Sequence, residues 1–227
     1  SKIKSRNLKL ITFGSKDVYF AEKEVQNIYI LNKKYHIKGL KLNKIQKENL
    51  ECAIACALAI NISPSKIIKT LVKLKSAPGR FEEIYYKKKS SKIIIDYAHT
   101  PDAIQNLLES YTKKSIKPSL VFGCGGDRDK GKRGQMGKIA YELADINIIT
   151  DDNPRFENPK IIRKEILQYC PNAIEIGDRK KAIMKTIQKL VNGDILLVAG
   201  KGHENSQEIN GRHLNFDDAK IIKSMIN

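Results

Sequence analysis

Residues Asn147–Arg155 read NIITDDNPR, an apolar run that ends abruptly in two acids, an amide, a proline and an arginine. This pattern indicates a buried strand that delivers a rigid polar turn to the edge of a sheet, with a helix beginning at Pro159. Pro154 fixes its own φ and disfavours a helical conformation at Asn153. Asn153 and Arg155 would therefore lose little freedom on binding, and an arginine held in this way presents a planar fork to a carboxylate.

Other apolar runs in the second half of the chain end in the same kind of polar turn. They are Ile93–Ile95 before Asp96–Asp102, Leu120–Phe122 before Gly123–Asp129, and Ile195–Val198 before Ala199–Glu204. Most of these turns precede a helical pattern, as does the apolar run Ala173–Ile176. Strands that alternate with helices predict an α/β fold with a mostly parallel sheet. Ligands of such sheets bind beyond the carboxyl ends of the strands, so we expect a site where these turns meet.

The composition limits the class of protein. A chain of 227 residues can form one large domain or a domain and a half, and 41% hydrophobic residues are typical of a soluble globular protein. Apolar runs fall short of the ~20 residues of a membrane span, and the basic start leads into no signal core, so we expect no membrane partner. Cys52, Cys56, Cys124 and Cys170 are expected to be free, buried thiols of a cytoplasmic protein, because their spacing suits neither zinc nor a disulfide framework.

The net charge of +17 raises the question of nucleic acid. Only eight of the 42 basic residues are arginine, the lysines are scattered, and no basic stretch is interleaved with aromatic residues. We therefore expect no nucleic-acid partner, although a binding module of that kind stays as an alternative. Arg128, Arg133 and Arg155 lie in strand-end turns, so a basic cleft for a polyanionic small substrate explains the charge equally well.

The first third of the chain has a different pattern. Short strands are predicted at residues 8–13, 27–31 and 35–42, with a hairpin turn at Asn32–Lys34. A helix is predicted from Lys44 to Ile60, and a second one begins with Ser63 as its cap and Pro64 in its first turn. Residues 76–80 form a short linker, so we place a domain boundary after residue 77. The piece before it has a thin core and is expected to be the end of a domain whose beginning is absent.

Residues 126–133 resemble a phosphate-binding loop, but Arg133 stands where Ser or Thr should hold Mg²⁺. We interpret this as coincidence. Gly123, Gly125 and Gly126 are not the dinucleotide-binding fingerprint either. They are expected to permit a tight turn at the sheet edge, which leaves Arg128 free to meet an anion.

Two acids at strand ends are candidate ligand contacts. Asp96 suits a ribose diol. The nearby His99 has three interpretations: a base, a ribose contact, or part of a capping turn in which Thr100 caps a helix. Glu204 follows two glycines and either pairs with a ligand's ammonium group or is an ordinary loop acid.

Together these turns resemble the Mur ligases, the ATP-dependent amide-forming enzymes of peptidoglycan synthesis. The matching elements, in family order, are Asn49, Pro78–Glu82, Asp96–Pro101, Gly123–Arg133, Asp152–Arg155 and Gly200–Glu204. The Asp-Asn-Pro-Arg form resembles that of the members that use meso-diaminopimelate as the incoming amino acid, whereas lysine-adding relatives differ there.

The resemblance implies a Rossmann-like C-terminal ligase domain at residues 78–227, preceded by the end of the central ATP-binding domain at residues 1–77. In the family, ATP phosphorylates the carboxylate of UDP-MurNAc-L-Ala-D-Glu, and the amine of the incoming residue attacks the acyl phosphate. The family's phosphate loop and Mg²⁺ ligands lie upstream of the matching part. The chain is therefore expected to be a monomeric fragment, inactive alone, without catalytic or metal-binding residues of its own.

The roles implied by the resemblance are binding roles. The amino-acid site is assigned Arg128, Asp152, Asn153, Pro154, Arg155, Gly200 and Glu204. The nucleotide group is assigned Asn49, Arg80, Asp96 and His99. One alternative is a ligase similar to folylpolyglutamate synthetase, whose glutamate site should not need Asp-Asn-Pro-Arg; the other is a non-catalytic nucleotide-binding module.

Overall fold

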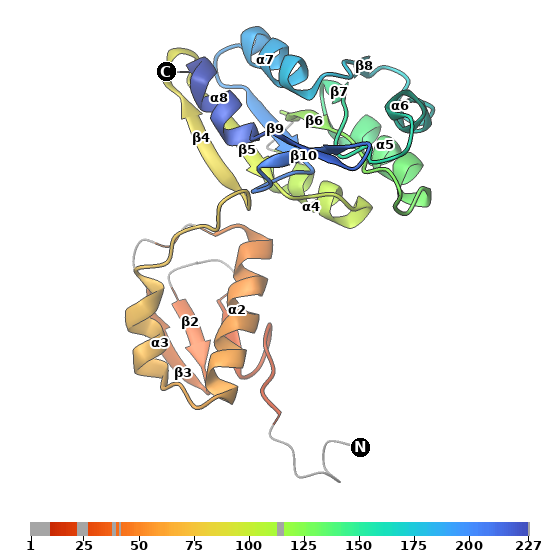
Figure 1. Cartoon of the computed structure of the whole chain (residues 1–227). Coiled ribbons are helices and arrows are strands. Elements are labelled where there is room, and N and C mark those ends of the chain that lie inside the picture. The colour runs from red at the N-terminus through yellow and green to blue at the C-terminus, as the bar shows by residue number, and fades with distance from the viewer. Residues whose placement is uncertain (1–9, 22–26, 38–39, 41, 113–115, 227) are drawn as a thin grey trace. The chain divides into compact units, whose positions relative to one another are not determined.

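The computed structural model describes residues 10–21, 27–37, 40, 42–112 and 116–226. The chain divides into two compact units, Ser1–Lys75 and Ser76–Asn227. The first is coloured red to orange and the second yellow to blue in Figure 1. The sequence places the boundary after residue 77 rather than 75.

The first unit begins with an antiparallel sheet of β1 (Val18–Phe20), β2 (Asn27–Ile30) and β3 (Lys33–His36). The hairpin turn consists of Leu31 and Asn32, both with positive φ, so the turn predicted at residues 32–34 is wrong by about one residue. The predicted strand at 8–13 is also wrong where it is described, because only Phe13 forms an isolated bridge. The predicted strand at 35–42 ends at His36; residues 8, 9, 38, 39 and 41 lie outside the described residues.

Two helices complete this unit. α2 (Lys44–Ala59) begins with a reciprocal capping box between Asn43 and Gln46, close to the predicted bounds. α3 (Pro64–Leu71) has Ser63 at its N-cap and its proline in the first turn, as predicted, although the side chain of Ser63 makes no capping hydrogen bond. The apolar faces of the helices and strands share one small core, formed by Val18, Phe20, Ile28, Ile30, Ile37, Ile54, Ala55, Leu58, Ile67 and Leu71.

The second unit contains, among the described residues, a six-stranded sheet in the order β4-β5-β9-β6-β7-β8. The central strands are β5 (Ser91–Asp96), β9 (Ile195–Ala199), β6 (Ser119–Phe122) and β7 (Asn147–Ile149). β8 (Ile174–Glu175) continues the parallel pairing at one edge, and β4 (Glu82–Tyr86) pairs antiparallel with β5 at the other. The predicted mostly parallel α/β sheet is confirmed.

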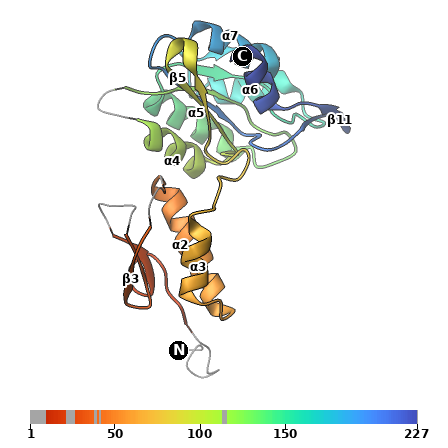
Figure 2. The same cartoon turned by 90° about the vertical axis from the view of Figure 1, so that its left-hand side faces the viewer.

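Helices cover both faces of this sheet (Figures 1 and 2). On one face lie α4 (Pro101–Tyr111), α5 (Gly131–Leu143) and α6 (Pro159–Leu167), which pack on strand residues such as Ile94 and Phe122. On the other lie α7 (Arg179–Lys189) and α8 (Asp218–Ile226), which pack on Ile93 and Ile95. Because both faces are covered, the strands read as continuous apolar runs.

A hairpin of β10 (Ser206–Ile209) and β11 (Arg212–Asn215) follows β9 and forms a separate two-stranded sheet. Asn210 and Gly211, both with positive φ, form its turn. A parallel bridge joins Ile209 to Arg155, so this hairpin lies against the turn that follows β7. The short 3-10 helix η1 (Lys87–Lys89) connects β4 to β5.

The thiols are all free, as predicted. Cys124 and Cys170 are buried, and burial raises the pKa of these thiols to about 12 and about 11. Cys56 is exposed and Cys52 is half-buried, which corrects the expectation that all four are buried. Of the helices in the described ranges, none combines the length and the apolar character that a membrane crossing requires.

Candidate functional site

The turns that follow β6 and β7 lie directly against each other at the carboxyl edge of the sheet. A Cβ atom at Gly126 would collide with the carbonyl oxygen of Pro154, so the two backbones touch where only glycine fits. Gly126 N–H donates to the carbonyl oxygen of Asn153 at 2.9 Å. The buried Pro154 therefore has a packing role, and the turn it stiffens is fixed on its neighbour.

Asn153 is the centre of a buried polar cluster. Its Nδ2 donates to Oε2 of Glu204 at 2.9 Å, and its Oδ1 accepts a hydrogen bond from Nζ of Lys201 at 2.9 Å. Lys201 Nζ also donates to Glu204 Oε2 at 3.0 Å. The structure thus brings Asn153 and Glu204, predicted from separate turns, into direct contact.

The cluster holds a charge that water cannot reach. The Lys201 side chain is 0% exposed, whereas that of Glu204 is 32% exposed and faces the edge of the cluster. Burial alone would raise the pKa of Glu204, but the hydrogen bonds from Asn153 and Lys201 lower that pKa below its ordinary value. Glu204 is therefore held as a carboxylate that is partly open to a ligand.

Arg155 adopts a left-handed backbone conformation with φ of 50°. Its Nε lies 3.0 Å from Oε2 of Glu208, and its Nη1 donates to the carbonyl oxygen of Gly126 at 2.8 Å. The side chain is only 18% exposed. Its guanidinium is therefore fixed in place before any ligand arrives.

The remaining residues predicted for the amino-acid site surround this cluster. Arg128 is exposed, and a Cβ atom at Gly125 would lie 2.9 Å from Nη1 of Arg155 and 3.9 Å from Cγ of Arg128, so the two arginines flank the same glycine. Asp152 is buried and accepts from the N–H of Asn153 at 2.7 Å. Gly200 follows β9, and its N–H donates to the carbonyl oxygen of Asp96 at 3.1 Å.

Asp96, predicted for the ribose, is tied into the backbone. Oδ2 accepts from the N–H of Phe81 at 2.9 Å, and Oδ1 accepts from the N–H of Ala98 at 2.8 Å. Burial raises the pKa of Asp96, while those two hydrogen bonds and the charge of Arg80 oppose the rise. Each oxygen keeps a second lone pair for a hydroxyl group.

Arg80 and His99 both contact the ring of Tyr97. The guanidinium carbon of Arg80 is 4.6 Å from the centre of the Tyr97 ring, a cation–π contact. The rings of Tyr97 and His99 are 4.6 Å apart, edge to face. His99 Nδ1 lies 2.8 Å from the carbonyl oxygen of Tyr97, which can only accept, so Nδ1 carries the proton. Thr100 caps α4 as predicted.

Asn49 belongs to the first unit, where it is an exposed residue of α2. Its side chain is therefore available to a ligand.

Arg133 has a different role from the one that its place in a strand-end turn suggested. It is 0% exposed, and its guanidinium binds Glu157 and Glu165 at 3.0 and 2.7 Å. These two carboxylates neutralise its charge inside the protein. The prediction that Arg133 contributes to a basic cleft is therefore wrong. α5 begins at Gly131, so residues 131–133 form a first helical turn.

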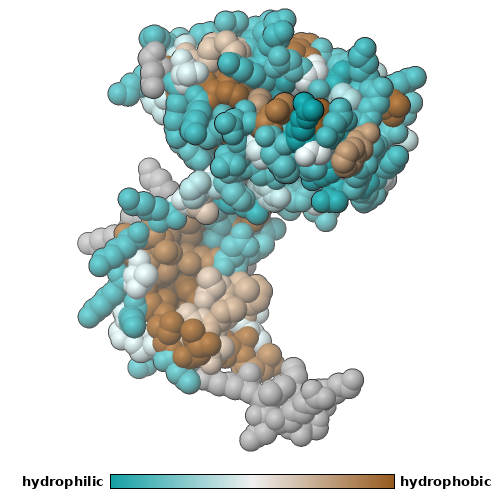
Figure 3. All heavy atoms as spheres, in the orientation of Figure 1, coloured by the Kyte–Doolittle hydropathy of each residue, from teal (hydrophilic) through white to brown (hydrophobic). Residues whose placement is uncertain are grey.

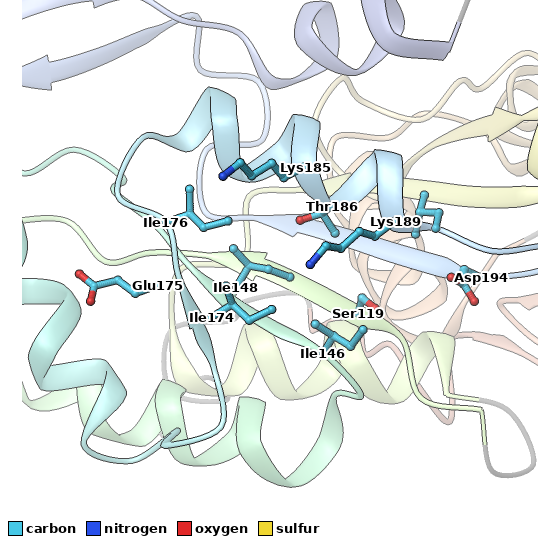
Figure 4. Close-up of a pocket in the computed structure, with 11 residues that line it drawn as sticks. Ser119, Ile146, Ile148, Ile174, Glu175, Ile176, Lys185, Thr186, Lys189 and Asp194 are labelled. Carbon is cyan, nitrogen blue, oxygen red and sulfur yellow. The ribbon is translucent and has the colours of Figure 1, made fainter.

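Among the described residues, no group of three or more His, Cys, Asp or Glu side chains could hold a metal ion. The carboxylates at the sheet edge instead pair with cations or backbone N–H groups, so the residues present do not form a Mg²⁺ site. A pocket of about 320 Å³ lies elsewhere, between α7 and the strands β7 and β8. Figure 4 shows Lys185 and Lys189 on one side of it and Ile146, Ile148 and Ile174 on the other; none of the predicted site residues lines it.

Three residues of the site were not predicted. The sequence does hold a signal for Lys201, a lysine between two glycines directly after an apolar strand. A lysine buried at such a place requires polar partners. Glu208 lies on β10, in the hairpin that the sequence analysis did not predict. Arg179 lies beneath the site, where it binds Asp218 at 2.7 Å with both side chains 0% exposed and donates to the carbonyl oxygen of Ala199.

A polar cluster at the carboxyl edge of a doubly covered parallel sheet defines a ligand-binding α/β domain. The family model of the Mur ligase, glutamate ligase domain matches residues 79–202. The chain belongs to the Mur ligase family.

Individual relatives agree with this assignment. The UDP-N-acetylmuramoyl-L-alanyl-D-glutamate–2,6-diaminopimelate ligase of Mesorhizobium japonicum is 44% identical over 182 residues, which cover 80% of this chain and 38% of that protein. A solved structure of a ligase with the same name is 33% identical, with a TM-score of 0.62, and covers 95% of this chain and 46% of that one. Folylpolyglutamate synthase of Thermotoga maritima, 20% identical with a TM-score of 0.62 over 87% of this chain and 47% of its own, shares the fold. The chain spans less than half the length of the curated relatives it matches.

Proposed function

We propose that this chain supplies the amino-acid-binding domain of a ligase that joins meso-diaminopimelate to UDP-N-acetylmuramoyl-L-alanyl-D-glutamate. The observation that carries the proposal is the contact of Asn153 with both Lys201 and Glu204, beside the fixed guanidinium of Arg155. An amino acid with two carboxylates and two ammonium groups requires cations and an acid close together. The names of the most similar relatives support the same substrate.

In this proposal the residues bind and orient the amino acid. Arg155 and Arg128 hold carboxylates, and Glu204 accepts from an ammonium group because its carboxylate stays charged. The attacking amine must be neutral, so the second ammonium group loses its proton before it reaches the acyl phosphate. Held by its far end, that amine is presented with a fixed direction, which accelerates the attack by proximity.

The nucleotide group follows the same proposal. Arg80 and Tyr97 form a flat cationic surface, Asp96 offers lone pairs to a ribose, and His99 offers Nε2 as an acceptor. ATP is the proposed nucleotide. ATP with Mg²⁺ would supply the acyl phosphate, and no residue of this chain is proposed as a metal ligand.

The first unit is proposed to be the end of the ATP-binding domain. Figure 3 shows apolar residues gathered on the face of this unit that is turned to the viewer. Large apolar side chains of the unit are about half exposed or more, among them Leu10, Ile60 and Val72. Such a surface is typical of one that packs against more protein. We further propose that the 227-residue polypeptide acts as a monomer and has no ligase turnover alone; phosphate release with ATP, UDP-MurNAc-dipeptide and meso-diaminopimelate tests the latter.

Titration of the ¹⁵N-labelled chain tests the binding proposal. We expect meso-diaminopimelate to shift the amide resonances of residues 152–155 and 200–204, and L-lysine to shift them far less. L-Glutamate as the stronger ligand would favour a folylpolyglutamate synthase-like enzyme instead. Shifts with none of the three amino acids would contradict the proposal. A DNA filter-binding series across salt concentrations tests the nucleic-acid alternative, since true phosphate contacts give a steep salt dependence.

A further inference from the structure

The hairpin β10–β11 fixes one residue, Glu208, against the amino-acid site. The N–H of Arg155 donates to the carbonyl oxygen of Glu208 at 3.1 Å, and the N–H of Asn210 donates back to the carbonyl oxygen of Arg155 at 2.8 Å. The N–H of Glu208 donates to Oδ1 of Asn153 at 3.0 Å. Gln207 Nε2 donates to the carbonyl oxygen of Asp152 at 2.6 Å. The position of Glu208 is therefore set by the backbone on both sides.

The carboxylate of Glu208 occupies one edge of the guanidinium that is proposed to bind the ligand. Its Oε2 is 3.0 Å from Nε of Arg155, and the two side chains are 23% and 18% exposed. Nη1 of Arg155 donates to the carbonyl oxygen of Gly126. Among the described residues, Nη2 is the guanidinium nitrogen of Arg155 that has no partner. A ligand carboxylate therefore meets this arginine at its Nη2 end, while Glu208 already balances its charge.

The charges around the site are balanced. The cations are Arg128, Arg155, Lys201 and Arg179, and the anions are Asp152, Glu204, Glu208 and the Asp218 that pairs with Arg179. Without Glu208 the group would carry one net positive charge. In a partly buried site that charge would attract any anion, whether or not the anion carried ammonium groups.

We infer that Glu208 is a specificity-determining residue: a resident counter-ion of Arg155 that makes the site select ligands without net charge. The inference rests on the proposed function of the site. A doubly zwitterionic amino acid has no net charge and gains contacts with both signs. A dicarboxylate of the same length has two negative charges, so it gains from Arg155 and is opposed by Glu204 and Glu208.

The substitution Glu208→Gln tests the inference, because it keeps an oxygen for Nε of Arg155 and the backbone contacts but removes the charge. The ligands are meso-diaminopimelate and pimelate, the same carbon chain without the ammonium groups. We expect the ratio of the dissociation constants, pimelate over meso-diaminopimelate, to fall about 10-fold in the variant, equivalent to ~1.4 kcal/mol. The difference should shrink as salt is raised.

The matched control is Glu175→Gln, which removes a carboxylate from another arginine, Arg163, whose Nε lies 2.7 Å from Glu175 Oε1. This control should leave the ratio unchanged. A second readout is independent of ligand: the Nε–H resonance of Arg155 should be slow to exchange with water in the wild type and faster in Glu208→Ala.

The outcomes separate the inference from the proposed function. If the wild-type chain binds meso-diaminopimelate and Glu208→Gln keeps the wild-type ratio, the inference is overturned and the proposed function stands. If the wild type does not bind meso-diaminopimelate, the proposed function is rejected. The pimelate titration then decides the inference: tighter binding to Glu208→Gln than to the wild type supports it, and equal or absent binding overturns it.

Discussion

The ammonium group of Lys201 lies 2.9 Å from Oδ1 of Asn153, although 48 positions separate the two residues in the sequence. Lys201 follows β9 and Asn153 follows β7, and β6 lies between these strands in the sheet. One buried hydrogen bond therefore joins two turns that are not neighbours in the sheet. It also places Glu204, which shares the ammonium group, beside the Asp-Asn-Pro-Arg turn.

Replacing Lys201 by Met should destabilise the second unit by about 2–3 kcal/mol, because a largely buried carboxylate loses its cation. This loss is smaller than the ~3–5 kcal/mol expected when a fully buried ion pair is broken, because Glu204 is partly exposed. Urea unfolding followed by far-ultraviolet circular dichroism measures the change. Lys181→Met is the control, since this lysine is 71% exposed and lies 3.8 Å from Asp178; its effect should stay below about 0.5 kcal/mol. Equal effects of the two substitutions would show that the buried cluster contributes no more than a surface pair.

Replacing Arg155 by Ala should weaken binding of meso-diaminopimelate by about 10- to 100-fold, given ~1.5–3 kcal/mol for a hydrogen bond to a charged group. Binding of L-lysine should hardly change, because L-lysine has no second carboxylate. A site built for a polar group rejects an analogue that lacks it. Titration calorimetry of both amino acids measures the two constants, and Arg212→Ala on the exposed strand β11 is the control. An equal loss for both amino acids would remove Arg155 as the source of selectivity.

Arg128→Ala separates a binding role from a structural one. If Arg128 holds a carboxylate, the variant should lose affinity for meso-diaminopimelate about 10-fold while its free energy of unfolding stays within about 0.5 kcal/mol of the wild type, as expected for an exposed side chain. Calorimetry and urea unfolding on the same sample give both quantities. A loss of stability with unchanged affinity would assign the residue to the loop instead.

The buried pair of Arg179 and Asp218 should be the most sensitive ionic contact in the unit. Arg179→Met leaves a carboxylate that is 0% exposed without its partner, at a cost of about 3–5 kcal/mol. Nη1 of Arg179 makes no hydrogen bond in the described structure, so the pair is not fully satisfied even in the wild type. The double variant Arg179→Met, Asp218→Leu should therefore recover much of the loss. Thermal unfolding of the three variants measures this, and strictly additive effects would contradict it.

Acid should weaken the contact between Glu157 and Arg133. Hydrogen bonds from Arg133 lower the pKa of Glu157 from 4.5 to about 2. Because the folded pKa lies below the unfolded one, the stabilisation is complete above about pH 4.5 and is lost as the pH falls towards 2. Glu157→Gln should cost about 2 kcal/mol at pH 7 and almost nothing near pH 2. Urea unfolding across this range checks the convergence; a constant difference would show that the carboxylate does not titrate with the fold.

Strands of the second unit were predictable because helices cover both faces of the sheet, so each central strand is a continuous apolar run between polar turns. The helices follow those turns. β5, β6, β7 and β9 fall within a residue or two of the predicted runs. The edge strand β4 was not predicted, since its half-buried alternation is interrupted by charged residues. The hairpin β10–β11 was also missed, although Asn210-Gly211 is a strong signal for a two-residue turn.

The site was predictable only as a set of turns. Topology brings the carboxyl ends of parallel strands together, so the meeting of the turns that carry Asn153 and Glu204 was predictable. The partners of these two residues were not predictable, because side-chain geometry, which no spacing rule contains, decides which acid pairs with which cation. Arg133 illustrates the limit, because its place in a polar turn resembles that of Arg128, and only the two carboxylates on the following helix and turn show that it is a structural residue.

Gly79 has one consequence for the geometry of the amino-acid site. Its backbone passes so close to Gly202 and His203 that any Cβ atom would collide with theirs, and its φ is +64°. The chain thus enters the second unit across the loop that carries Lys201 and Glu204. A side chain at position 79 would therefore displace this loop, and with it the ammonium group and the carboxylate that the amino-acid site places side by side.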